Sequence, residues 1–191
     1  HDMPARLDEA LAHGQLPVDR YLSHPVVRSA AAAVAVYPYS LYFDGVPFTR
    51  NDGLLAVYLT NLVTNEIHLL IALRKSEMCE CGCKHWCTLY VLLLVLDWAF
   101  RHCGPLAVEP GARHDQTDWH DDEPQRAARA RTPLSSLMAI LLLEGDLMEN
   151  SSSLGLPSVG SIAHGCAYCW STPLEWPLAV GLSPVTFPFR L

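Results

Sequence analysis

The chain has 191 residues, of which 50% are hydrophobic and only 17% are charged. This composition excludes intrinsic disorder over most of the length, and the length favours one globular domain with a single sizeable core. The formal net charge is −7, the wrong sign for a protein that holds nucleic acid through a broad basic surface. The longest apolar run, residues 88–100, contains Asp97 and is shorter than the roughly 20 residues that a membrane-spanning helix needs. We therefore predict no membrane span.

The start of the chain and its cysteines indicate an intracellular location. The residues after His1 have neither the basic start nor the apolar core of a secretory signal. The seven cysteines are odd in number and clustered, which is more typical of metal ligation than of a secreted disulfide framework. We expect a fragment of an intracellular protein that is kept under reducing conditions.

The first part of the chain predicts short helices followed by a sheet. Residues 1–36 have helical apolar spacing, which prolines divide into short helices. Three apolar runs of strand length follow at residues 40–48, 53–64 and 66–75, with turn-forming residues between them. This pattern predicts a three-stranded antiparallel meander.

The second part predicts a helix, a charged loop and a further strand. Residues 87–104 are apolar on nearly every face, so we expect a helix buried against the sheet. Residues 105–131 are charged, which favours a long surface loop with a short helix at its basic end. The apolar run 137–143 predicts a strand buried on both faces. Residues 173–191 are rich in proline, and we expect an irregular tail there.

A dense cysteine cluster lies between the third strand and the long helix. Its five candidate ligands fall within nine residues: Cys79, Cys81, Cys83, His85 and Cys87. Thiolates and imidazoles are the ligands that zinc prefers, and Gly82 allows the backbone to fold tightly around an ion. We predict a structural zinc site here, and the alternative is a loop of free buried thiols.

A second pair, Cys166 and Cys169, has the Cys-x-x-Cys spacing. Such a pair needs two more ligands for zinc, and the remaining donors are His164, Cys103 or the first cluster. The two clusters either share one zinc or hold one each. A redox-active pair is the alternative, although no thioredoxin-like strand and helix flank it.

Two acids stand at the ends of predicted strands. Asp44 follows the apolar start of the first strand, and Asp146 follows the fourth strand. A carboxylate at such a position requires a cation or a hydrogen-bonding partner. If the two strands are neighbours, the acids are candidate ligands of Mg²⁺ in phosphodiester chemistry. Alternatively, Asp44 begins a turn with Gly45 and Asp146 caps its segment without a metal.

The order of the elements resembles a known enzyme core. Three meander strands with an acid in the first, then a helix, then a fourth strand followed by an acid are similar to the ribonuclease H-like core of DDE/DDD transposases and integrases. The cysteine insert before the helix, and Asp146 followed about twenty residues later by Cys166-Ala-Tyr-Cys169, resemble the Plavaka and Kyakuja-Dileera-Zisupton transposases. The resemblance covers residues 37–172.

This resemblance implies an α/β fold with a ribonuclease H-like mixed sheet and cysteine-rich inserts. It implies that Asp44 and Asp146 are catalytic carboxylates that bind Mg²⁺, and that Cys166 and Cys169 bind zinc. The implied activity is metal-assisted attack of water or a 3′-hydroxyl on a DNA phosphodiester. DNA is then the partner, and a nuclear location is expected.

The chain departs from this family at the third catalytic acid, which lies on a later helix. The only acid after residue 150 is Glu175, between Pro173 and Pro177, where a regular helix cannot form. We therefore expect a catalytically incomplete remnant. The rival hypothesis is a non-enzymatic zinc-stabilised interaction module, in which the six cysteines hold the fold and loop 105–131 binds a protein partner.

Overall fold

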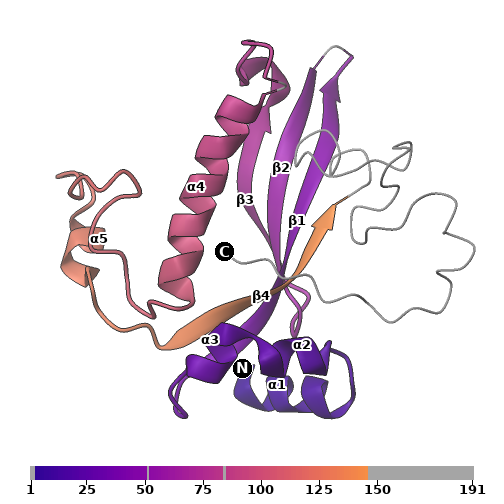
Figure 1. Cartoon of the computed structure of the whole chain (residues 1–191), viewed down its shortest axis with the longest axis vertical. Coiled ribbons are helices and arrows are strands. Elements are labelled where there is room, and N and C mark those ends of the chain that lie inside the picture. The colour runs from indigo at the N-terminus through magenta and orange to yellow at the C-terminus, as the bar shows by residue number, and fades with distance from the viewer. Residues whose placement is uncertain (1–2, 51, 84, 146–191) are drawn as a thin grey trace, which may run out of the picture.

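A computed structural model describes residues 3–50, 52–83 and 85–145 (Figure 1). Within these ranges the chain forms a mixed α/β structure around one four-stranded sheet. The tail predicted at 173–191 and the sites predicted at Asp146, Cys166 and Cys169 lie outside the described residues.

Three short helices precede the sheet, as the proline spacing predicts. They are α1 (Met3–Ala12), α2 (Val18–Ser23) and α3 (Pro25–Ser29). Leu7, Leu16 and Tyr21 form a small buried cluster, and the Tyr21 hydroxyl donates to the carbonyl of Val36 at 2.7 Å. This buried hydrogen bond ties the helices to the first strand.

The predicted meander is confirmed. Strands β1 (Ala35–Thr49), β2 (Asp52–Asn61) and β3 (Ile67–Arg74) pair antiparallel in sequence order. Strand β4 (Ser136–Gly145) lies beside β1 and runs parallel to it, so the strand order is β3-β2-β1-β4. A parallel neighbour requires a long crossover connection, which residues 75–135 provide.

The prediction that the fourth strand is buried on both faces is wrong for its C-terminal half. Leu137 and Ala139 are buried, but Leu143 is 39% exposed. Within the described residues β4 is an edge strand, and a continuous apolar run does not by itself distinguish a central strand from an edge strand.

The crossover contains the short 3₁₀ helix η1 (Lys75–Glu77) and the long helix α4 (Trp86–Cys103). Helix α4 lies along one face of the sheet (Figure 1). Leu96 packs against a core that includes Phe43 and Val57, and Leu89 packs against Leu55 and Met78. Because side chains alternate along a strand, these contacts define the face of the sheet that α4 covers.

The predicted helix packs against the sheet, but its outer face is exposed, so the prediction that α4 is buried is wrong for that face. Four large apolar side chains on it are between 45% and 53% exposed, namely Trp86, Tyr90, Val91 and Leu94. By length and composition alone α4 could cross a membrane, although a helix that packs against a sheet in a soluble protein passes the same test. The absence of a membrane span stays a prediction.

Residues 105–131 form an ordered segment after the C-terminal end of α4, which we call the excursion. Its base is closed by the bridge between Val108 and Pro133 and by backbone hydrogen bonds of Glu109 with Arg131 and Thr132. The predicted short helix at its basic end is α5 (Pro124–Arg129). The region is therefore a surface segment, as predicted, but one with its own hydrogen bonds and packing.

Candidate metal centre

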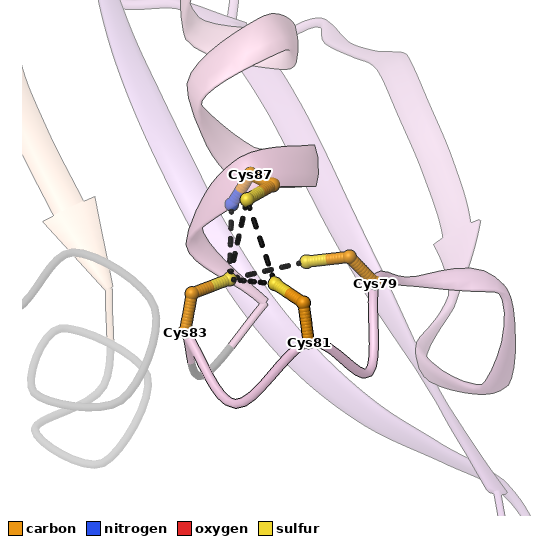
Figure 2. Close-up of side chains that lie close together, drawn as sticks. All are labelled: Cys79, Cys81, Cys83 and Cys87. Carbon is orange, nitrogen blue, oxygen red and sulfur yellow. Dashed lines mark hydrogen bonds between the residues drawn. The ribbon is translucent and has the colours of Figure 1, made fainter.

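The four cysteines of the first cluster converge on one point. Three come from the loop between η1 and α4, and Cys87 lies in the first turn of α4 (Figure 2). The Sγ–Sγ distances are 3.3 Å from Cys79 to Cys83, 3.2 Å from Cys81 to Cys83, 3.6 Å from Cys81 to Cys87 and 3.5 Å from Cys83 to Cys87. All four sulfurs lie within 4.8 Å of one another.

These distances fit a tetrahedral metal site. A Zn–S bond of about 2.3 Å implies a sulfur–sulfur edge of roughly 3.8 Å in a regular tetrahedron. The four sulfur–sulfur distances of 3.2–3.6 Å are slightly shorter than that edge, and none approaches the roughly 2.0 Å of a disulfide bond. The four cysteines could therefore hold a metal ion, plausibly zinc, with a small outward movement of the sulfurs.

The backbone of the loop allows this convergence. Gly82 has φ +84°, with nothing within 4 Å of where a Cβ would lie, so a residue with a side chain would be strained here by the backbone conformation and not by packing. A left-handed conformation costs glycine little. His85 also has a positive φ, of 67°, and directly precedes α4. The two left-handed residues turn the chain so that Cys79, Cys81 and Cys83 face Cys87.

Several hydrogen bonds hold the ligands in place. The Cys79 amide donates to Thr88 Oγ1 at 3.0 Å, and the Cys87 amide donates to Cys83 Sγ at 3.3 Å. His85 Nδ1 lies 3.0 Å from the Cys79 carbonyl oxygen. Because that carbonyl can only accept, Nδ1 donates, and His85 supports the loop instead of completing the cluster.

The electrostatics of the cluster favour a cation. Cys87 lies in the first turn of α4, its amide donates to Cys83 Sγ, and the positive end of the helix dipole stabilises thiolates there. Hydrogen bonds from the thiol and backbone of Cys83 lower the pKa of Cys81. Hydrogen bonds to Cys83 and Cys81, and their nearby charge, raise the pKa of Cys87 to about 12. A metal ion would replace the shared protons.

The other predicted site residues are placed differently. Asp44 is half-buried in the interior of β1, opposite Ala56 of β2. The alternative in which Asp44 starts a turn with Gly45 is therefore wrong, since β1 continues to Thr49. The preceding residue, Phe43, pairs with Gly145 at the end of β4. The partner acid, Asp146, lies outside the described residues.

The remaining histidines and acids in the described ranges do not form a second cluster of this kind. In the excursion, Asp115 Oδ1 accepts hydrogen bonds from the backbone and hydroxyl of Thr117 at 3.0 and 2.6 Å, which lower the pKa of Asp115. Cys103 is half-buried at the far end of α4, where burial raises its pKa. The first cluster is thus complete without Cys103 or His164.

Sequence reasoning missed the supporting residues. Thr88 follows the last cysteine, and its hydroxyl accepts the amide hydrogen of the first cysteine. Nothing in the spacing of the cysteines indicates that contact. The fold and this site define a mixed α/β protein with a four-cysteine cluster that could hold a metal ion. No family model, curated protein or solved structure matches the chain.

Proposed function

We propose that the chain is a ribonuclease H-like domain of transposase type, derived from an enzyme that cuts or joins DNA phosphodiester bonds with divalent metal ions. The observation that supports this proposal is the sheet order β3-β2-β1-β4, with α4 in the crossover and β4 parallel to β1. That order makes β1, which bears Asp44, the neighbour of β4, which Asp146 follows in the sequence, as the proposed pair of carboxylates requires.

Asp44 is suited to a ligand's role by its position on the sheet. It lies one residue beyond the last pair between β1 and β4, and β2 fixes its backbone from the other side. It lies on the face opposite Phe43, and therefore opposite α4. A carboxylate held this way loses little further freedom when it binds a cation. Mg²⁺ bound by Asp44 and Asp146 would supply Lewis-acid chemistry at a phosphodiester.

The four-cysteine cluster has a structural role in this proposal. Zinc bound by Cys79, Cys81, Cys83 and Cys87 would join the end of η1 to the start of α4, and so fix the first half of the crossover. All four ligands are thiolates, so no position is left open for a reacting water. Zinc bound by Cys166 and Cys169 remains part of the same proposal, on the basis of the resemblance to the transposases.

Substitution of Asp44 by asparagine tests the catalytic part of the proposal. In the purified zinc-loaded chain, D44N should weaken Mn²⁺ binding, measured by electron paramagnetic resonance, by about tenfold or more, because a charged ligand is lost. Zinc content should not change. The matched control is Asp19→Asn on the exposed face of α2, which should bind Mn²⁺ like the parent chain.

A second candidate function is a zinc-stabilised interaction module without catalysis. The exposed apolar face of α4 and the ordered excursion at residues 105–131 favour it, because both present surface that a protein partner could cover. The same experiment separates the two functions. Equal Mn²⁺ binding by D44N, D19N and the parent chain would contradict the transposase proposal and leave the interaction module.

A further inference from the structure

The C-terminal end of α4 carries a second feature, a cluster of aromatic rings. Trp98 makes edge-to-face contacts with three rings: His102 at 5.5 Å, His114 at 6.3 Å and Trp119 at 6.3 Å between centroids. The guanidinium of Arg126 lies 5.4 Å from the centre of the Trp119 ring. Such contacts fix ring orientations, so the excursion holds Trp98 in one defined position.

A hollow of about 290 Å³ opens beside this cluster. Its wall includes Trp98 and His102 from α4, and Arg113, Gln116 and Arg131 from the excursion. The volume is near the lower end of the roughly 300–1,000 Å³ of ordinary ligand sites, enough for one nucleotide unit. The hollow therefore combines aromatic surface with cationic and amide donors.

The charges at the hollow favour an anion. Glu109 also lines it, but Glu109 is paired with Arg129. Arg113 lies 4.0 Å from Glu123, a weak contact, and Glu123 is closer to Arg126 at 3.3 Å. Arg131 has no ion-pair partner among the described residues. Its side chain packs over Gly111, where an added Cβ would lie 2.8 Å from Nε.

His102, which also lines the hollow, has one ring nitrogen available for a ligand. Its Nδ1 donates to the carbonyl of Val108 at 3.2 Å, which leaves Nε2 available for another partner. Trp98 and His102 are one helical turn apart on α4 and are both half-buried. A planar ring that enters the hollow can therefore contact aromatic surface and still meet a polar atom.

We propose that this hollow binds one nucleotide of a single-stranded nucleic acid, with the base against Trp98 and His102 and a phosphate at Arg131 and Arg113. Base stacking on aromatic rings together with cationic contacts to the backbone is the general chemistry of single-strand binding. A base can stack on the rings of the hollow only when it is unpaired and unstacked from its neighbours, so the site takes a nucleotide of a single strand.

The test uses the full zinc-loaded chain without Mg²⁺ and a short fluorescent single-stranded DNA, followed by anisotropy. Arg131→Ala should weaken binding by about tenfold or more, since one charged phosphate contact is lost. The control Arg20→Ala, an exposed arginine of α2, should bind like the parent chain. Gly111→Ala should weaken binding too, because it displaces the Arg131 side chain without removing its charge.

Two further probes decide which part of the nucleotide is recognised. An abasic strand of the same length should bind about tenfold more weakly, because the stacking contribution is missing, and duplex DNA should not displace the single strand. Equal affinity of R131A and R20A, or of abasic and normal strands, would overturn the proposal. Strand binding is measured without divalent metal and Mn²⁺ binding at Asp44 is measured without the strand, so failure here is distinguishable from failure of the proposed catalytic site.

Discussion

The two ends of α4 carry side-chain clusters that are built in opposite ways. At the N-terminal end, four cysteines within nine residues form a cluster that could hold a metal ion (Figure 2). At the C-terminal end, Trp98 gathers rings from His102, His114 and Trp119, so the cluster depends on how residues 105–131 fold back (Figure 1). A site built from one short segment can be predicted from the sequence. A site built from residues far apart in the sequence becomes apparent only in the folded structure.

The largest expected effect is at the N-terminal end. Cys83 Sγ contacts all three of the other sulfurs, so Cys83→Ser should abolish zinc retention by the four-cysteine cluster. It should also lower the free energy of unfolding by several kcal/mol, since binding of structural zinc contributes on the order of 10 kcal/mol. Elemental analysis and thermal denaturation measure both effects. Cys103→Ser at the other end of α4 is the control and should keep its zinc.

In the middle of α4, the two faces of the helix differ in burial. Leu96 is 7% exposed and belongs to the main core, whereas Leu94 is 47% exposed. Leu96→Ala should cost about 2–5 kcal/mol in urea denaturation because it removes buried methyl groups and leaves a cavity. Leu94→Ala should change stability by less than about 1 kcal/mol. Equal losses would mean that the outer face of α4 is covered in solution.

A smaller effect is expected from substitution of Thr88, which holds the cysteine loop in place. Thr88→Val removes the oxygen that accepts the Cys79 amide hydrogen while it preserves the size of the side chain. The unpaired amide should cost about 1–3 kcal/mol, and zinc affinity should fall about 10- to 100-fold, as for other residues that orient metal ligands. Competition with a chromophoric chelator measures the affinity. An unchanged affinity would remove Thr88 from the site.

The smallest effect concerns the excursion at the C-terminal end. Hydrogen bonds from Thr117 lower the pKa of Asp115, so the folded turn favours the ionised carboxylate. This stabilisation is present above the unfolded pKa of about 4 and is lost as pH falls through the lower folded value. The amide resonance of Thr117 should therefore titrate at acidic pH. In Asp115→Asn, which keeps an oxygen acceptor, that titration should be absent.

Local patterns in the sequence predict much of the fold. Apolar runs of strand length with turn residues between them predict β1, β2 and β3, and the cysteine spacing predicts the four-cysteine cluster. The burial of α4 is mispredicted for a physical reason. Leu94 has the same side chain as Leu89 and Leu96 but is 47% exposed, whereas they are 5% and 7% exposed. The sequence of a helix that is apolar on nearly every face does not say which face will meet the sheet.

The hollow beside Trp98 could not be predicted from the sequence. The acids and arginines of residues 105–131 indicate a solvated loop, which is the usual structure of such a composition. The base of the excursion depends on the pairing of Val108 with Pro133. These residues are 25 positions apart in the sequence, and no hydrophobic periodicity predicts their contact. Asp44 is an intermediate case. Its strand, β1, is predictable from the sequence, but the placement of β4 beside β1 depends on the crossover.

The most direct test of the four-cysteine site is zinc X-ray absorption on a Cys166→Ser/Cys169→Ser double variant, which leaves Cys103 as the only cysteine outside the cluster. We predict one zinc per chain with four sulfur neighbours at about 2.3 Å. A first shell of three sulfurs and one imidazole nitrogen, or loss of the zinc from this variant, would contradict the site described here.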